Sequence, residues 1–431
     1  MADAAHFAPI WSGRRLLSAA IWLVAATAAA APSDPNPWSR WRGANGAGQG
    51  GEARFPVTWT ESDWAWTATL PGAGNASPVV WGNHIYTASA DEAAGRRFVT
   101  AHALADGKLL WSRDLPGPID PHHAQNSSAS GSVAVDARGV YWMWGTHDGV
   151  RVEAFSPTGQ PRWHVELGPC EAEHGFGATP AVCRDLLIVP DDQDGPSGIV
   201  ALDTATGRER WRLPRESAKA GYATPLVVED YPGAGGPVVF VTSMAHGVTA
   251  IEGLSGRLLW ERECFSKRTV SSPILAGSLV IGTSGDGGGD NLLSAVRPPS
   301  SAAAEPELAY TLDRSIAPYV PTPLCVGDLI YLWGDRGVVT CVRIATGETV
   351  WRGRVGGTYS ASPIAVGDTI RNVSAEGEVV AIRMGDSFEV LGRATLGEAC
   401  RATPAVVGRR MVFRTTGRLL ALDAERAAGG E

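Results

Sequence analysis

Short apolar stretches recur along this chain, and a small hydroxyl residue followed by proline opens most of them. From Pro180 onward, consecutive prolines of this kind lie 40 to 50 residues apart. The gap from Pro78 to Pro180 is 102 residues, or two repeats, and Ser130-Gly131-Ser132-Val133 stands midway as a degenerate copy. The spacing therefore predicts eight repeats. The clear copies are Ser77-Pro78, Thr179-Pro180, Thr224-Pro225, Ser272-Pro273, Thr322-Pro323, Ser362-Pro363 and Thr403-Pro404.

A glycine followed four residues later by tryptophan comes late in most repeats. Upstream of the glycine stand an apolar pair and often aspartate, as in Ala201-Leu202-Asp203. Since aspartate bonds turn amides and glycine supplies a positive φ, the pattern predicts a strand, a tight turn and another strand. In the repeat that opens at Thr179 we expect four strands, at 179–182, 186–190, 198–202 and 208–213. The glycine and tryptophan pairs are Gly107 and Trp111, Gly159 and Trp163, Gly207 and Trp211, Gly256 and Trp260, and Gly347 and Trp351.

A single four-stranded repeat is too small and too one-sided to be stable alone. Eight such sheets arranged radially bury both faces against their neighbours, and a recurring large aromatic fills the gaps between them. We therefore predict an all-β fold, an eight-bladed β-propeller of four-stranded antiparallel blades. The inter-blade packing residues are expected to be Trp66, Trp111, Trp163, Trp211, Trp260 and Trp351.

The last repeat lacks a fourth strand, whereas residues 64–71 resemble a fourth strand with no repeat before them. We predict that this N-terminal strand completes the last blade, which leaves no open sheet edge. Two repeats depart from the pattern. The fifth has Tyr310 and a loop at Pro298-Pro299 in place of the glycine and tryptophan, and the seventh has Leu391 near the tryptophan position.

The N-terminus has the order of a secretory signal: Arg14-Arg15, an apolar run from residue 16 to 30, and small residues before Pro32. We expect residues 1–31 to be a signal peptide, with a short membrane anchor as the alternative. Residues 32–60 would form an ordered strap or a linker, and 61–431 the propeller. These features predict a periplasmic or secreted protein without a membrane span after cleavage.

Composition narrows the function classes. With 44% apolar and 19% charged residues, the chain has the balance of a packed protein rather than a disordered one. A net charge of -8 without a basic run argues against nucleic-acid binding. The six cysteines form no Cys-x-x-Cys motif, which argues against zinc and dithiol redox sites. Buried free thiols are the favoured interpretation of these cysteines, and disulfides stay open as the alternative.

The sequence Ala201-Leu202-Asp203, with Thr206-Gly207 and Trp211, resembles the pyrroloquinoline-quinone-type β-propeller repeat. That resemblance covers about residues 64 to 423. The superfamily includes quinoprotein dehydrogenases and a cofactor-free outer-membrane assembly scaffold. The dehydrogenases carry a vicinal cysteine pair, a calcium site and a catalytic aspartate, and none of these can be placed here. The chain is therefore more similar to the scaffold branch, although it lacks that branch's lipid-attachment cysteine.

In a propeller, the connections between blades and the turns between second and third strands emerge on one face. The connections carry Gln125, Asn126, Tyr222, Arg314 and Arg401, among others. Three interpretations compete: a merely solvated polar face, a binding funnel, or a metal or catalytic site using His174 with Glu171 or Asp286 with Asp290. The candidate binding residues on this face are His122, His123, Glu171, His174, Asp192, Gln193, Asp194, His246, Arg268, Asp286 and Tyr319.

These observations favour an exported, monomeric binding or scaffolding module that recognises a protein or a glycan through its loop-rich face. No cofactor is predicted for that function, and no catalytic residue is assigned. The alternatives are an alcohol or sugar dehydrogenase that uses pyrroloquinoline quinone and calcium, and a glycan or solute sensor.

Overall fold

The computed structural model describes residue 1 and residues 38–216, 218–287, 289–301 and 304–424. Contacts divide the chain into residues 1–34 and 35–431, and only the second unit is described here. The expected signal peptide therefore lies outside the described residues, except for its first residue. In the described part of the chain, no helix is both long and apolar enough to cross a membrane.

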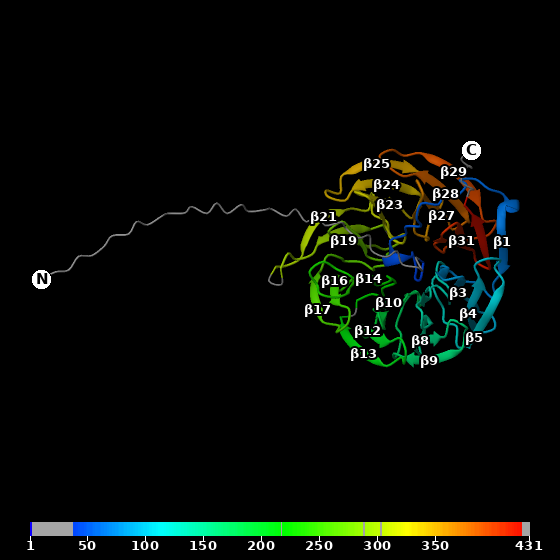
Figure 1. Ribbon diagram of the computed structural model, residues 1–431, viewed down its shortest axis with the longest axis horizontal. Helices are drawn as coiled ribbons and strands as arrows, with labels where there is room; N and C mark the ends of the chain where they lie inside the picture. The colour runs from blue at the N-terminus through cyan, green and yellow to red at the C-terminus, as the bar shows by residue number, and fades with distance from the viewer. Residues whose placement is uncertain (2–37, 217, 288, 302–303, 425–431) are drawn as a thin grey trace. The chain divides into compact units, whose positions relative to one another are not determined.

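Eight four-stranded antiparallel sheets form a ring, which confirms the predicted eight-bladed propeller (Figure 1). Blades 1 to 4 are β2 (Val79–Trp81), β3 (His84–Asp91), β4 (Arg96–Ala103) and β5 (Leu109–Pro116); β6 (Ala134–Val135), β7 (Val140–Thr146), β8 (Gly149–Phe155) and β9 (Pro161–Glu166); β10 (Ala181–Cys183), β11 (Leu186–Asp191), β12 (Ser197–Asp203) and β13 (Glu209–Arg215); and β14 (Leu226–Val228), β15 (Val238–Ser243), β16 (Gly247–Glu252) and β17 (Leu258–Arg262).

Blades 5 to 8 repeat the same arrangement, and two short 3-10 helices, η1 (Ala44–Gly46) and η2 (Glu61–Asp63), precede the first strand. These blades are β18 (Ile274–Ala276), β19 (Leu279–Ser284), β20 (Leu292–Arg297) and β21 (Glu307–Leu312); β22 (Leu324–Val326), β23 (Leu329–Trp333), β24 (Val338–Arg343) and β25 (Thr349–Arg354); β26 (Ile364–Val366), β27 (Thr369–Val373), β28 (Glu378–Arg383) and β29 (Val390–Thr395); and β30 (Ala405–Val407), β31 (Arg410–Arg414), β32 (Arg418–Asp423) and β1 (Trp64–Thr69).

Ring closure follows the prediction. The N-terminal strand β1 pairs antiparallel with β32, so that Trp66 stands opposite Ala421 and Thr69 opposite Arg418. The backbone N–H of Leu70 extends the pairing by donating to the Gly417 carbonyl (2.8 Å). The first and last parts of the propeller chain thus share one sheet.

The antiparallel order fixes two different faces. The first strand of each blade starts where the preceding connection ends, so connections and the turns between second and third strands emerge at the same end. We call this end the loop face and the opposite end the turn face. Tight turns with glycine, such as Gly82 and Gly207 at positive φ, lie on the turn face.

The hydroxyl residue before each proline has a structural role that the sequence pattern alone does not explain. A residue before proline is held extended, and in seven of the eight positions the backbone N–H donates to the hydroxyl of the equivalent residue in the next blade. The last blade is joined to the first where Thr403 N–H donates to Ser77 Oγ (3.0 Å). The other bonds of this hydroxyl belt run from Ser77 to Ser132, Ser132 to Thr179, Thr224 to Ser272, Ser272 to Thr322, Thr322 to Ser362 and Ser362 to Thr403, each at 2.9 to 3.0 Å.

Tryptophans on the outer strands pack against the next blade at its turn-face glycine. The Trp163 indole N–H donates to the Thr204 carbonyl (3.1 Å), and a Cβ on Gly207 would lie 2.8 Å from the indole ring. Trp66, Trp111, Trp211 and Trp351 make the same indole bond to the carbonyls of Leu104, Pro157, Gly253 and Gly385.

The outer strands of blades 4, 5 and 7 make other contacts at this position. Trp260 packs in the apolar cluster that contains Val280 and Val296 of blade 5. Tyr310 takes the tryptophan position of blade 5, and its hydroxyl donates to the Ile344 carbonyl (2.9 Å). In blade 7 the register places Gly392 opposite Ala381, one residue beyond Leu391, and the N-terminal segment covers it at Val57.

Replacing Gly207 with alanine is expected to lower the free energy of unfolding by about 2 to 4 kcal/mol, because a new Cβ meets the Trp163 ring at a positive φ. Urea unfolding measures the loss. Gly327 has a similar positive φ with no atom within 4 Å of the added Cβ, so the matched Gly327→Ala change should cost only about 1 kcal/mol. Equal losses at the two positions would contradict the inter-blade contact.

All six cysteines are free thiols, four of them buried and two half-buried. Burial raises the pKa of the Cys170 and Cys400 thiols to about 12. These side chains are therefore neutral packing groups at physiological pH.

Candidate binding cavity

Residues 38–51, which we call the channel segment, lie inside the ring rather than beside it (Figure 1). The Trp38 carbonyl accepts from Val80 N–H (2.8 Å) and the Ser39 carbonyl accepts from Val135 N–H (2.9 Å). In blade 7, Ala365 bonds Gly48 and Gly50 through its N–H and carbonyl. The channel segment thus pairs with the innermost strands of blades 1, 2 and 7.

Two buried arginines hold the channel segment. Arg42 donates through Nη1 to the Pro323 carbonyl (3.1 Å) and through Nη2 to the Pro363 carbonyl (3.0 Å). Arg40 donates to the Pro225 carbonyl (3.5 Å). The hydroxyl and proline pairs therefore have two roles. Their N–H and hydroxyl groups form the belt, and three of the proline carbonyls accept hydrogen bonds from these two guanidinium groups. Burial lowers the pKa of Arg42 to about 9, and both side chains stay charged at neutral pH.

The chain then runs from the channel to the outer strand of blade 8. The carbonyls of Phe55 and Pro56 accept hydrogen bonds from the Arg371 guanidinium (2.5 and 2.8 Å). Trp59 packs against Phe413, with ring centroids 5.8 Å apart. The residues that follow the channel segment thus connect it to β1 in blade 8.

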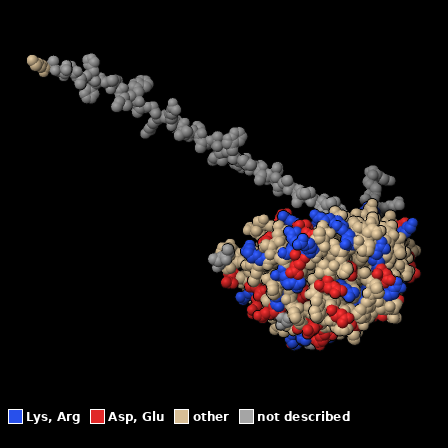
Figure 2. All heavy atoms as spheres, turned by 90° about the horizontal axis from the view of Figure 1, so that it is seen from below, with Lys and Arg blue, Asp and Glu red and all other residues tan. Residues whose placement is uncertain are grey.

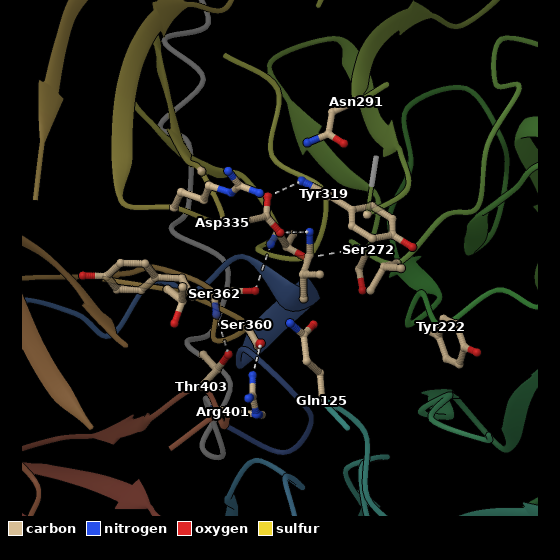
Figure 3. Close-up of a pocket in the computed structure, with 18 of the residues that line it drawn as sticks. Gln125, Tyr222, Ser272, Asn291, Tyr319, Asp335, Ser360, Ser362, Arg401 and Thr403 are labelled. Atoms are coloured by element: carbon tan, nitrogen blue, oxygen red, sulfur yellow. Dashed lines mark hydrogen bonds between the residues drawn. The ribbon is translucent and has the colours of Figure 1, made fainter. Parts of the chain in front are cut away.

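A cavity of about 1020 Å³ opens on the loop face above the channel segment (Figure 3). Trp41 of the channel segment lines it, so the channel is a pit at this end rather than a continuous passage. Every one of the eight connections contributes to the wall. Each connection supplies at least one lining residue. In chain order, examples are Asn75, His123, His174, Tyr222, Val270, Tyr319, Ser360 and Arg401.

The cavity is positively charged, although the chain as a whole carries -8. Four arginines line it, and none of them lies within 4 Å of a carboxylate of the described residues. The two acidic residues of the wall are engaged: Asp335 accepts Tyr319 N–H (2.8 Å), and Asp286 pairs with Lys267 Nζ (2.7 Å). The surface in Figure 2 instead shows acidic and basic side chains interspersed. The four arginines are Arg314, Arg336, Arg352 and Arg401.

Four of the predicted binding residues line this cavity: His123, His174, Asp286 and Tyr319. The rings of His123 and His174 lie 5.1 Å apart between centroids. Burial and the nearby charge of Arg268 lower the pKa of His174, so this imidazole is neutral at physiological pH. The His174 imidazole can therefore accept or donate a hydrogen bond to an occupant.

His122 and Glu171 lie elsewhere, in a second cavity of about 490 Å³ beside blades 1 and 2. His122 Nε2 contacts Glu92 Oε1 at 2.9 Å. Because His174 lines the larger cavity and Glu171 the smaller one, the structure separates the two residues considered as a metal pair. Asp286 and Asp290, the other pair considered, both contact Lys267 Nζ, at 2.7 and 3.5 Å.

The other predicted residues are occupied by contacts inside the protein. Gln193 is buried and bridges the Pro169 carbonyl and Glu171 N–H. Asp194 accepts from the N–H groups of Glu173 and Ala220 (both 2.8 Å). The remaining contacts are Asp192 with Arg215 (2.8 Å), His246 with Glu261 (2.9 Å) and Arg268 with Glu173 (3.2 Å).

A buried carboxyl beside these residues gives a pH-dependent prediction. Burial raises the pKa of Asp191 to about 7, from about 4 in an unfolded chain. The stability it contributes is thus fully present below about pH 4 and is lost as the pH rises through 7. Asp191→Asn should raise the free energy of unfolding at pH 8 by about 2 to 4 kcal/mol and leave it nearly unchanged at pH 4.

Urea unfolding at the two pH values measures this difference. The matched control is Asp185→Asn, because the Asp185 side chain is half exposed beside Arg210. This variant should change the free energy of unfolding by the same small amount at both pH values. An equal effect of Asp191→Asn at pH 4 and pH 8 would contradict the buried carboxyl.

Sequence reasoning missed Trp41, Arg336, Arg352 and Tyr359, which all line the larger cavity. Arg336 directly follows Asp335 in a loop-face turn, so its place in the repeat was a usable signal. Arg352 stands on the outer strand β25, where nothing in the pattern indicates a cavity. Trp41 belongs to the channel segment, whose location the repeats do not encode.

The described residues of the cavity wall do not gather the ligands that a calcium ion beside a quinone would need. The described residues contain no group of three or more His, Cys, Asp and Glu side chains that could hold a metal ion. Both oxygens of Asp335 already accept backbone N–H groups, from Tyr319 and Val320. We therefore derive no chemical step through a quinone.

The family model described as outer membrane protein assembly factor BamB matches residues 147–231, 227–297 and 309–428. The chain belongs to this BamB family. Among solved structures, BamB from Moraxella catarrhalis is similar with a TM-score of 0.60 and 16% identity, over 84% of this chain and 98% of that one. No curated protein matches the chain.

Two alcohol-oxidising dehydrogenases share the fold of this BamB family member. A europium-containing methanol dehydrogenase has a TM-score of 0.67 at 11% identity, over 91% of this chain and 98% of that one. A quinohemoprotein alcohol dehydrogenase from Comamonas testosteroni has a TM-score of 0.58 at 12% identity, over 85% and 78%. At these identities the likeness concerns the fold alone.

Proposed function

We propose that this protein is an exported binding module that holds its ligand in the larger loop-face cavity. The observation that carries the proposal is that all eight connections and Trp41 line one cavity of about 1020 Å³. Ligand sites are concave, few in number and largely preformed. The hydroxyl belt and the channel segment supply the rigid support that such a site needs. The signal-like pattern of residues 14–31 supports export.

The wall supports binding more than catalysis. Its two carboxylates are engaged by Lys267 and by backbone N–H groups, so neither is free to act as a general base. The arginines and tyrosines that line the cavity are instead suited to recognition. A protein segment is the second candidate occupant, favoured by the assembly-factor description of the family.

A blocking variant tests the site. Ser360 lines the cavity and its hydroxyl accepts from Arg401, so Ser360→Trp should fill the mouth. Thermal-shift screening of saccharides, peptides, alcohols and quinone with calcium would first find ligands that raise the Tm. Each true ligand should bind at least about tenfold more weakly to Ser360→Trp.

The matched control is Ser255→Trp, at an exposed residue in the turn between β16 and β17 on the turn face, which should bind normally. Binding that Ser360→Trp leaves unchanged would overturn the proposed site. Reduction of an artificial electron acceptor by the quinone-loaded protein with an alcohol would overturn the choice of binding over catalysis.

A further inference from the structure

The charge of the larger cavity is concentrated on one side. Arg314 lies in the connection from blade 5 to blade 6, Arg336 in the turn between β23 and β24, and Arg352 in β25. Arg352 donates to the Ser315 carbonyl (2.7 Å), which ties it to the same connection. Arg401 donates to Ser360 Oγ (3.0 Å) further round the wall (Figure 3). These guanidinium groups form one cationic arc. Among the described residues none of them lies within 4 Å of a carboxylate, and the nearby carboxylates of Asp313 and Asp335 offset part of the charge of Arg314 and Arg336.

The opposite wall is neutral and rich in hydrogen-bonding groups. It presents the amide of Gln125 together with Asn75, whose Nδ2 donates to the Gln125 carbonyl (3.2 Å), and Asn126, whose Nδ2 donates to the His174 and Phe176 carbonyls. In the described part of the wall, the Tyr222 hydroxyl is buried without a hydrogen-bond partner. Buried polar groups favour a polar neighbour. This half of the cavity thus suits an occupant with many hydroxyl groups.

Few aliphatic side chains reach the cavity, and the edge strands of the sheets contribute little to its wall. The aliphatic lining is limited to Val270, Ile316, Ala317, Val320 and Val338. Peptides are usually anchored by apolar side chains in pockets or by main-chain pairing with a sheet edge. Each sheet has an inner and an outer edge strand. Among the described residues, no inner edge strand lines the cavity, and the outer edge strands contribute a single side chain, Arg352 of β25. The cavity therefore favours a sugar over a peptide.

From these features we propose that the cavity recognises an acidic oligosaccharide, one that carries carboxylate or sulfate groups. The inference rests on the proposed function and names its ligand class. Guanidinium groups bind carboxylate and sulfate with two parallel hydrogen bonds, which an ammonium group cannot do. The acidic groups bind the arginine arc, while the hydroxyl groups of the sugar face the opposite wall at Gln125.

Calorimetric titration of the full chain tests the assignment with four probes: an oligogalacturonate, its neutral galactose counterpart, a sulfated galactose oligomer and an oligoglutamate peptide. The acidic sugars should bind, and the neutral sugar and the peptide should bind at least about tenfold more weakly. The stronger of the two acidic sugars identifies the acidic group. Affinity should fall as NaCl is raised from about 0.05 to 0.3 M.

The double variant Arg314→Gln with Arg336→Gln should weaken binding of the acidic sugars by about 30-fold or more. Both side chains are exposed, so the variant should keep the wild-type Tm. The control is Arg257→Gln, an exposed arginine in a turn-face turn, which should bind like the wild type. Unchanged binding by the double variant would overturn the inference.

The outcomes separate this inference from the proposed function. If the neutral sugar or the peptide binds best and Ser360→Trp abolishes that binding, the cavity stands as the site and the acidic-sugar assignment fails. If the acidic sugars bind but Ser360→Trp leaves them unaffected, both fail, because the site lies elsewhere. Binding of none of the four probes, under conditions where the thermal-shift screen finds another ligand, also overturns the acidic-sugar assignment alone.

Discussion

Arg42→Ala is expected to lower the free energy of unfolding by about 3 kcal/mol or more. The change leaves the carbonyls of Pro323 and Pro363 without their charged donor and opens a void in the channel. Arg42 is 1% exposed, so water does not already satisfy these carbonyls. Urea unfolding measures the loss.

The control for Arg42 is Arg54→Ala, which removes an arginine from the same N-terminal stretch. The Arg54 side chain is 74% exposed and its nearest carboxylate contact, to Asp368, is 4.0 Å, so its loss should cost about 0.5 kcal/mol or less. Arg42→Lys should be intermediate, since one ammonium group replaces a fork that reaches two carbonyls. If Arg42→Ala lowered the free energy of unfolding as little as Arg54→Ala, the channel segment would not be held inside the ring by Arg42.

Trp66→Ala is expected to cost about 3 to 5 kcal/mol, the usual range for a buried tryptophan. The Trp66 indole packs against Gly107 and donates to the Leu104 carbonyl (3.1 Å), so it joins blade 8 to blade 1. Because Trp66 lies on β1, its loss should also loosen the pairing with β32. Hydrogen exchange should therefore rise in both strands, with unfolding by urea measuring the stability.

Trp211→Ala is the matched variant, because Trp211 makes the same contact between blades 3 and 4, far from the closure. It should cost a similar free energy without raising exchange in β1 and β32. If Trp66→Ala were silent while Trp211→Ala was destabilising, β1 would not be the fourth strand of the last blade in solution.

The repeat architecture was predictable because its signals are local. A turn that needs glycine at positive φ, and an outer strand that needs an indole against that glycine, stand within a few residues of one another, as Gly207 and Trp211 do. The hydroxyl belt was not predictable, because the partner of Ser77 is Ser132 in one direction and Thr403 in the other. Only the closed ring brings these residues together.

The candidate site was predictable in part for the same reason. The repeat places His123, His174 and Tyr319 on the loop face, and the structure adds that they share one cavity. The repeat pattern does not indicate whether a polar loop side chain faces a ligand or the protein's own backbone. Gln193 and Asp194 bond the backbone. The repeat pattern also gives no position for the channel segment, because residues 38–51 precede the first repeat.

The central claim is that the channel segment seals the ring and leaves an arginine-lined pit open on the loop face. Phenylglyoxal labelling of the native protein, read by peptide mass spectrometry, tests this directly because the reagent modifies accessible guanidinium groups. Arg314 and Arg336 should react at the rate of exposed arginines, and Arg40 and Arg42 at least about 100-fold more slowly. Labelling of Arg42 as fast as Arg336 would contradict the account.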